Sequence, residues 1–161
     1  MSFIVAPAVS LAVPRRWVTF DDPAPGVALL ARAPAATRCG FVPELALHTG
    51  PVDVPTVTEW RDEAMAALTG QLTDLEVDDT DVVDLDGEPA AYTRFSHRLG
   101  GTDVVCDQWA WLRDGVGVTL TGTVALADYA DYADLFEGVA ATVRLSPDPP
   151  VGGVASAAPG V

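Results

Sequence analysis

Three two-residue turns constrain the fold of this 161-residue chain more than any other feature. Each pair contains glycine and is typical of the tight turns that join antiparallel strands. The pairs are Asp86-Gly87, Gly100-Gly101 and Asp114-Gly115. They predict a four-strand meander over residues 75–85, 88–99, 102–113 and 116–124. Earlier apolar stretches predict shorter antiparallel strands at 16–21, 26–32 and 41–48.

The turns also fix which residues face each other across neighbouring strands. The second turn places Arg94 opposite Asp107, and the first places Asp79 opposite Arg94. Opposite charges in facing positions stabilise a sheet. We therefore expect a structural ionic row of Asp79, Arg94 and Asp107.

Alternation along these strands sorts the side chains into two faces. The apolar face is the expected core, and it carries Val77, Val83, Leu85, Tyr92, Val105, Trp109, Trp111, Val118, Leu120 and Val124. The second face is mixed and rich in threonine, and solvent, a second thin layer or a partner remain open as its covering. Its candidate protein-contact residues are Phe95, His97, Thr119, Thr121 and Thr123.

Two helices complete the pattern. Thr56 and Glu59 form a capping-box motif, which predicts a helix beginning near Thr56. Its apolar residues recur at helical spacing, so we expect Trp60 to be buried and Arg61 to lie on the solvent side with Asp62 and Glu63. A second helix is predicted from about residue 128 to 143, with acidic residues toward its N-terminal half, where the helix dipole favours them.

Charge limits the classes of partner. Lysine and arginine total 9 and acidic residues total 23, which gives a net charge of −14. Nucleic acids and anionic membranes both favour basic surfaces, so we expect neither as a partner. No stretch approaches the roughly 20 apolar residues of a membrane-spanning helix.

The cysteines and the N-terminus bear on the compartment. Two cysteines, Cys39 and Cys106, do not make a disulfide framework or a zinc site, and we expect two unbridged, buried thiols. The apolar N-terminal stretch is interrupted by Pro7 and has no positive charge before it, which favours a first strand over a signal peptide. We therefore expect a cytoplasmic protein.

Three segments of the chain resemble a known family. Val13-Pro14-Arg15-Arg16-Trp17 resembles an early Pro-x-Gly-Trp segment, with Arg16 in place of the usual glycine. Residues 85–90 resemble the Gly-x-Pro-Ala turn that opens a long central strand, and an aromatic strand after Gly100-Gly101 leads to the terminal helix. In this order, across residues 9–145, they resemble the LpqN-type proteins of high-GC bacteria.

This resemblance implies the PsbP-like fold, which is also found in the Ran-binding Mog protein and in Eag-type secretion chaperones. Such folds usually bind or assist other proteins, and the resemblance supplies no catalytic motif. LpqN-type proteins are typically exported lipoproteins. Because this chain shows no lipobox, the resemblance does not carry over the location.

Several patterns suggest chemistry, and each has a structural explanation. Ser96 and His97 are neighbours in one strand, so their side chains point to opposite faces and cannot form a dyad. Cys106 and His97 share a face but lie diagonally in mid-sheet, where a cysteine is usually a buried thiol. Trp109 alternates with core residues and is expected in the core.

The acidic run over residues 74–88 does not fit a calcium-binding EF-hand loop. A charged, solvated edge strand explains it, and weak cation binding by this run is left open. We expect no catalytic residue, no metal site and no cofactor.

The sequence thus predicts an α+β protein with a single antiparallel sheet of about six or seven strands packed with two helices. The domain spans residues 1–145, followed by a flexible Pro/Gly/Ala-rich tail over 146–161. The expected function is a non-enzymatic protein-binding, accessory or chaperone-like module. A small-molecule binder or enzyme with a pocket between sheet and helix is the first alternative, and a homodimeric structural protein is the second.

Overall fold

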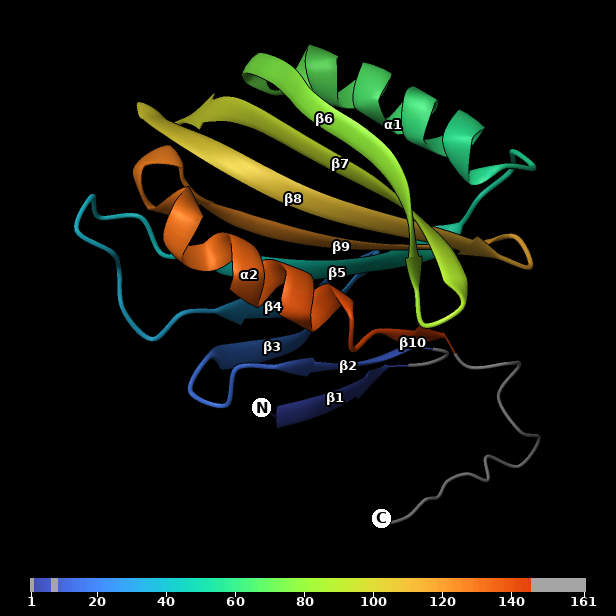
Figure 1. The fold of residues 1–161 in the computed structure, drawn as a ribbon, viewed down its shortest axis with the longest axis horizontal. Coiled ribbons are helices and arrows are strands. Elements are labelled where there is room, and N and C mark those ends of the chain that lie inside the picture. The colour runs from blue at the N-terminus through green and yellow to red at the C-terminus, as the bar shows by residue number, and fades with distance from the viewer. Residues whose placement is uncertain (1, 7–8, 146–161) are drawn as a thin grey trace.

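The computed structural model describes residues 2–6 and 9–145 (Figure 1). The predicted tail over 146–161 lies outside the described residues. In chain order the elements are β1 (Ser2–Ala6), β2 (Val9–Val13), β3 (Val18–Ala24), β4 (Val27–Arg32), β5 (Glu44–Pro51), α1 (Val57–Gln71), β6 (Thr73–Leu85), β7 (Glu88–Leu99), β8 (Thr102–Arg113), β9 (Val116–Ala125), a short 3-10 helix (Leu126–Asp128), α2 (Tyr129–Ala140) and β10 (Arg144–Leu145).

A seven-stranded antiparallel sheet dominates the fold, in the order β3-β4-β5-β9-β8-β7-β6. The predicted α+β architecture is confirmed, and the four meander strands agree with their predicted bounds to within two residues. Both residues of each predicted turn have positive φ, between 52° and 85°. This conformation matches the right-handed twist of the flanking strands. Because Asp-Gly and Gly-Gly pairs favour it, the sequence predicted all three turns.

The prediction of a single sheet was incomplete. β1, β2 and β10 form a second, three-stranded sheet in the order β1-β2-β10. Arg144 and Leu145 of β10 pair with Ser10 and Val9 of β2. A two-residue strand carries no periodic pattern, so only the folded chain shows it.

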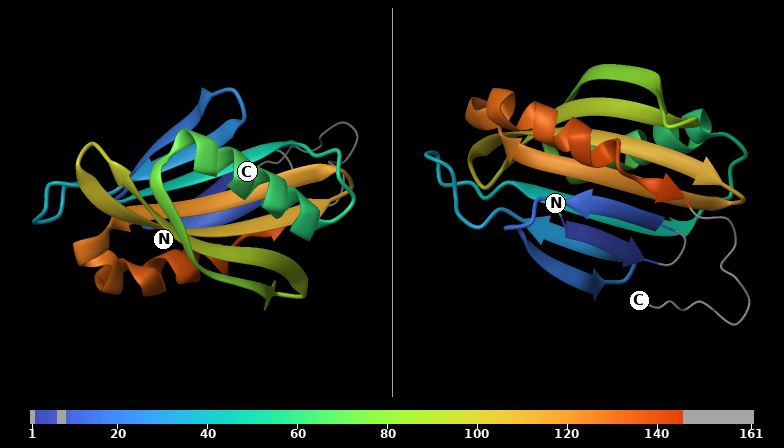
Figure 2. Two further views of the ribbon diagram at one scale, coloured as in Figure 1. Left: turned by 90° about the horizontal axis from the view of Figure 1, so that it is seen from above. Right: turned by 60° about the horizontal axis from the view of Figure 1, so that its bottom comes forward.

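The core lies on one face of the large sheet, where α2 and the small sheet pack (Figure 2). β2 contributes three fully buried side chains, which follow the alternation of a strand. α2 contributes residues at helical spacing. The main members from these two elements are Val9, Leu11, Val13, Phe136, Val139 and Ala140.

Helix α1 lies across the other face of the large sheet (Figure 2, left). The side chain of Thr56 accepts a hydrogen bond from the backbone N–H of Glu59 at 3.1 Å, as the capping-box pattern predicts. Trp60 packs at Gly117 of β9, where an added Cβ would lie 2.6 Å from the indole ring. The prediction for Arg61 was wrong: it is 7% exposed and is the one buried residue of this helix.

The proposed contact face is largely covered, because α1 packs on it. Phe95, His97 and Thr119 are buried, while Thr121 and Thr123 are half-buried. These five residues therefore do not form an open surface. Val77 also departs from its predicted core position, because a bulge between Val77 and Asp79 places it opposite Phe95, with 49% of its surface exposed.

Candidate functional site

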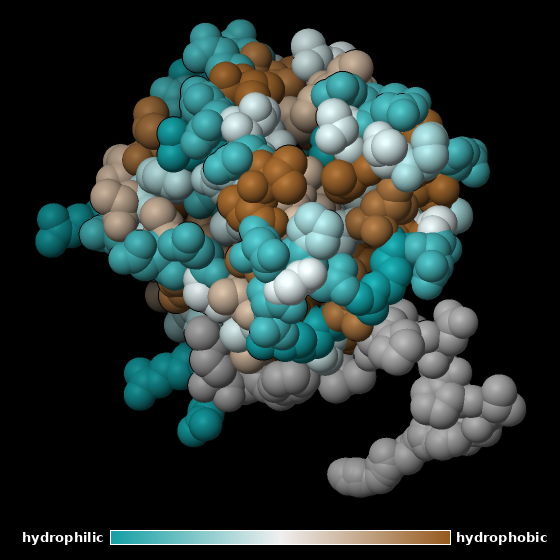
Figure 3. All heavy atoms as spheres, turned by 45° about the vertical axis from the view of Figure 1, so that its right-hand side comes forward, coloured by the Kyte–Doolittle hydropathy of each residue, from teal (hydrophilic) through white to brown (hydrophobic). Residues whose placement is uncertain are grey.

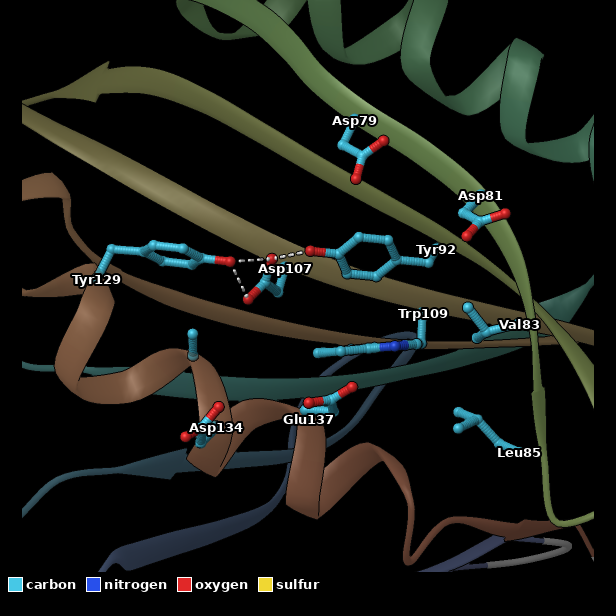
Figure 4. A pocket seen from close by; sticks show the side chains of 11 residues that line it. Asp79, Asp81, Val83, Leu85, Tyr92, Asp107, Trp109, Tyr129, Asp134 and Glu137 are labelled. Atoms are coloured by element: carbon cyan, nitrogen blue, oxygen red, sulfur yellow. Dashed lines mark hydrogen bonds between the residues drawn. The ribbon is translucent and has the colours of Figure 1, made fainter.

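A pocket of about 260 Å³ lies between α2 and the strands β6, β7 and β8 (Figure 4). β6 is an edge strand of the large sheet, so this pocket lies toward that edge. The residues lining it are Asp79, Asp81, Val83, Leu85, Tyr92, Asp107, Trp109, Tyr129, Ala133, Asp134 and Glu137. This lining contains five carboxylates and no lysine, arginine or histidine.

Asp107 on β8 is the deepest carboxylate of the pocket and is only 2% exposed. Two tyrosine hydroxyls converge on it from opposite sides (Figure 4). The Tyr92 hydroxyl donates to Oδ1 at 2.5 Å. The Tyr129 hydroxyl lies 3.1 Å from Oδ1 and 3.0 Å from Oδ2. A buried carboxylate needs such donors, because leaving it without partners costs several kcal/mol.

The environment shifts the ionisation of all three groups. Burial raises the pKa of Asp107, while the hydrogen bonds from Tyr92 and Tyr129 and the nearby Arg94 oppose that rise. Burial, together with the hydrogen bond to Asp107, raises the pKa of Tyr92. Burial also raises the pKa of Tyr129. Both tyrosines therefore remain hydroxyl donors at neutral pH.

The expected ionic row is present in register but not as ion pairs. Asp79 lies opposite Arg94, and Arg94 lies opposite Asp107. Among the described residues, however, no salt bridge within 4.0 Å involves Arg94. Its guanidinium carbon instead lies 5.8 Å from the ring centroid of Tyr129. The hydroxyls of Tyr92 and Tyr129 bind the Asp107 oxygens. Asp107 is therefore paired with these two tyrosines and not, as the ionic interpretation expected, with Arg94.

The other carboxylates of the pocket stand on two facing walls. Asp79 and Asp81 come from β6, and Asp134 and Glu137 come from α2 (Figure 4). None of these four takes part in a salt bridge within the described part of the chain. Unpaired carboxylates held near one another attract a cation, because each lowers the electrostatic energy of a positive charge between them.

Aromatic and aliphatic side chains complete the lining. The rings of Tyr92 and Trp109 lie 5.3 Å apart between centroids, tilted by 45°. Val83 and Leu85 of β6 line the end of the pocket away from Asp79 (Figure 4). The pocket thus offers carboxylates to a charged head and aromatic or aliphatic surface to the stem that carries it.

The other chemical candidates do not form a reactive site. The Sγ of Cys106 lies 3.8 Å from Nε2 of His97, and both residues are buried beneath α1. Burial raises the pKa of Cys106 to about 11, so the sulfur is a thiol at neutral pH rather than a nucleophilic thiolate. Cys39 is exposed rather than buried, and both cysteines are free, as predicted.

Within the described residues, no group of three or more His, Cys, Asp or Glu side chains is arranged to hold a metal ion. None of the described helices is both long and apolar enough to cross a membrane.

A pocket between sheet and helix was expected only in the first alternative, with no residues assigned to it. The sequence interpretation assigned the acidic run to a solvated edge and the carboxylates of the second helix to the helix dipole. Both explanations treat each segment alone, whereas the pocket depends on α2 lying beside β6. The register did predict the strand side of the site: Tyr92 faces Trp109, and Asp79 and Asp107 lie in one row on either side of Arg94.

Comparison with known proteins shows a shared fold without close sequence similarity. No family model matches the chain, and no curated protein matches it. The crystal structure of LpqN, involved in cell envelope biogenesis of Mycobacterium tuberculosis, has a TM-score of 0.70 at 14% identity and covers 88% of this chain and 85% of its own. The solution structure of CyanoP, the PsbP of the cyanobacterium Synechocystis, has a TM-score of 0.62 at 15% identity, with 86% of each chain covered.

A protein of unknown function, PA94 from Pseudomonas aeruginosa, has a TM-score of 0.64 at 15% identity and covers 93% of this chain and 99% of its own. These neighbours share the sheet and helix arrangement, and their low identity restricts the likeness to the fold. The chain therefore has a PsbP-like fold.

Proposed function

We propose that the protein is a non-enzymatic accessory module that binds a basic side chain of another protein in the pocket between α2 and β6–β8. The observation that carries this proposal is the pair of acidic walls around an aromatic floor, with no cation of the chain's own lining the space. A lysine or arginine side chain has the matching chemistry, because its charged head pairs with carboxylates while its stem packs on apolar surface.

The size of the pocket supports a single side chain as its occupant. Pockets for small-molecule ligands are usually about 300–1,000 Å³. This pocket measures about 260 Å³, below that range. A partner protein inserts one side chain and gains further contacts around the rim.

The net charge and the face of the molecule shown in Figure 3 support an electrostatic rather than an apolar contact. On the side of the molecule shown in Figure 3, hydrophobic side chains are interrupted by hydrophilic ones instead of forming one broad patch. The net charge of −14 attracts a basic partner over a distance and raises its rate of association at low salt.

A small organic cation is the second candidate, because the same carboxylates and rings suit an ammonium group. The two candidates differ in whether the ligand makes contacts outside the pocket. A partner protein contributes contacts beyond the pocket, whereas a polyamine has only its charges and stem.

The test is titration of the ¹⁵N-labelled protein with a short end-capped peptide whose only charge is that of one central lysine, and separately with spermidine. We expect the peptide to shift amide signals of β6 and α2 saturably. The double variant Asp134→Asn/Glu137→Gln should weaken this binding about tenfold or more. The control Asp53→Asn/Glu63→Gln removes the same number of charges from exposed positions away from the pocket.

Equal weakening by both double variants would mean that net charge alone drives the interaction, which would overturn the proposal. Absence of peptide binding to the unmodified protein would do the same. Tighter saturable binding of spermidine than of the peptide would favour the second candidate.

A further inference from the structure

A second cavity, of about 420 Å³, lies between α1 and the strands β6 and β7, of which β6 is an edge strand of the large sheet. It belongs to the opposite face of the sheet from the α2 pocket. Side chains from successive turns of α1 form one wall, and β6 and β7 form the other wall. The lining residues are Thr58, Arg61, Asp62, Met65, Thr80, Asp81, Val82, Ala91, Tyr92 and Thr93.

Arg61 distinguishes this cavity from a simple groove under a helix. The residue is 7% exposed, yet it takes part in no salt bridge within 4.0 Å of a described carboxylate. Its Nε is buried and has no hydrogen-bond partner. A buried charge is normally paired, because desolvation without a partner is costly. This chain has 23 acidic residues, so the missing partner does not reflect a shortage of carboxylates.

The guanidinium is held in place rather than left loose. One of its terminal nitrogens donates to Oε1 of Gln108 on β8. Nε2 of Gln108 in turn donates to Oγ1 of Thr121 at 3.0 Å, which fixes the amide so that its oxygen faces Arg61. The guanidinium carbon also lies 5.0 Å from the ring centroid of Trp60. These contacts orient Arg61 without neutralising its charge.

The charge itself persists at neutral pH. Burial lowers the pKa of Arg61 to about 10, and no neighbouring carboxylate raises it back. The group is therefore a positively charged donor in a largely apolar setting at pH 7. In such a setting, a charge-assisted hydrogen bond to an anion is stronger than at the protein surface.

We infer that this cavity binds a small monocarboxylate, whose carboxylate accepts hydrogen bonds from Arg61 and whose apolar chain packs between α1 and β6–β7. The apolar wall for that chain is provided by Met65, Val82 and Ala91. The hydroxyls of Thr58, Thr80 and Thr93 also line the space and can donate to carboxylate oxygens.

The charges around Arg61 favour a singly charged ligand. Asp62 and Asp81 also line the cavity, and both repel anions. A phosphate dianion doubles its attraction to Arg61 and its repulsion by the two aspartates alike, but its desolvation cost rises more steeply, with the square of its charge. A carboxylate retains the paired geometry with a guanidinium at the lower cost.

The test uses sodium butanoate and sodium hexanoate as probes, with hexylamine and inorganic phosphate for comparison. Binding is followed through the amide signals of β6 and β7 in the ¹⁵N-labelled protein. We expect saturable shifts with both carboxylates, tighter binding of hexanoate than of butanoate, and no saturable shift with hexylamine or phosphate.

Arg61→Met removes the charge but keeps an unbranched apolar side chain, and it should weaken hexanoate binding at least tenfold. The matched control is Arg98→Met, which removes an exposed arginine that pairs with Asp103 at 2.9 Å and should leave binding unchanged. Because Arg61 carries a buried unpaired charge, its replacement should leave the melting temperature unchanged or raise it. A structural role alone would lower it.

Arg61→Lys covers the case in which Arg61→Met does not fold. Lysine keeps the charge but loses the two-pronged geometry, so the Arg61→Lys variant should bind hexanoate more weakly than the unmodified protein does. The same variant should still bind hexanoate more tightly than it binds hexylamine. Any one of three results would overturn the inference. They are non-saturable shifts with hexanoate, equal hexanoate binding by Arg61→Met and Arg98→Met, and tighter binding of phosphate than of hexanoate.

Discussion

The ring of Phe136 in α2 lies directly on Gly122 of β9: a Cβ added at that glycine would come within 2.6 Å of the ring. Gly122 faces the core, and Phe136 is fully buried there. The absence of a side chain on β9 lets the helix approach the sheet at this point. This contact sets the height of α2 above the sheet, and therefore the width of the acidic pocket that α2 shares with β6–β8.

Gly122→Ala should destabilise the protein by about 1–3 kcal/mol, because the ring and the helix must shift to make room for a methyl group. Urea unfolding at constant pH measures this change. Gly138→Ala on α2, the helix that carries Phe136, is the control, since nothing lies within 4 Å of a Cβ added there. That control should be neutral or stabilising by up to about 1 kcal/mol, as alanine favours helix. Equal effects of the two changes would contradict the close-packing explanation.

Tyr129→Phe should destabilise the protein by about 1–3 kcal/mol, because it removes the hydroxyl that contacts both oxygens of the buried Asp107. Thermal and chemical unfolding both report the loss. Tyr132→Phe is the control: Tyr132 packs near Phe136 with ring centroids 6.1 Å apart, and no described hydrogen bond involves its hydroxyl. A loss for Tyr129→Phe no larger than for the control would show that the hydrogen bonds contribute little.

Asp107 should titrate above its usual pKa of 3.8, because burial is the largest influence on its carboxyl group. A folded-state pKa above the unfolded value means that the native state binds the proton more tightly. Stability from this group therefore falls as the pH rises from the unfolded to the folded pKa, and it is recovered on acidification. A ¹³C titration of the Asp107 carboxyl measures the shift, and Asp107→Asn should remove this component of the pH dependence. A pKa below 3.8 would contradict the prediction.

Arg94→Ala should cost only about 0–1 kcal/mol, since Arg94 forms no described salt bridge and is half-buried rather than in the core. A buried ion pair in its place would cost several times more to break. Denaturant unfolding of the variant distinguishes these cases. A loss above 2 kcal/mol would restore the original ionic interpretation of the row.

The two cysteines should differ sharply in reactivity. Cys39 is exposed, whereas Cys106 is buried with its pKa raised to about 11. At pH 8 in native buffer, a thiol reagent should label Cys39 rapidly and Cys106 only at the rate at which the sheet opens. In denaturant without reductant, both should react at once. Labelling of only one thiol after denaturation would be inconsistent with two free cysteines.

Local chemistry in the sequence determined most of the large sheet. Glycine and aspartate at the three turns accept the positive φ that a two-residue hairpin needs, and each turn fixes the pairing of the strands on either side. Arg94 therefore lies opposite Asp107 as predicted. Strand alternation then placed Trp109 on the core face without any knowledge of the helices.

Only the tertiary structure decided what covers each face and what lies beside what. The sequence predicts Arg61 on the solvent side of α1, because a charged residue between apolar positions of a helix is normally exposed. Its burial depends instead on α1 lying over Gln108 of β8. The acidic pocket likewise requires α2 to lie beside β6, although three strands, three turns and the short 3-10 helix separate these elements along the chain. Contacts between distant segments leave no local period in the sequence, because they follow from how the helices and the small sheet pack together to bury apolar surface.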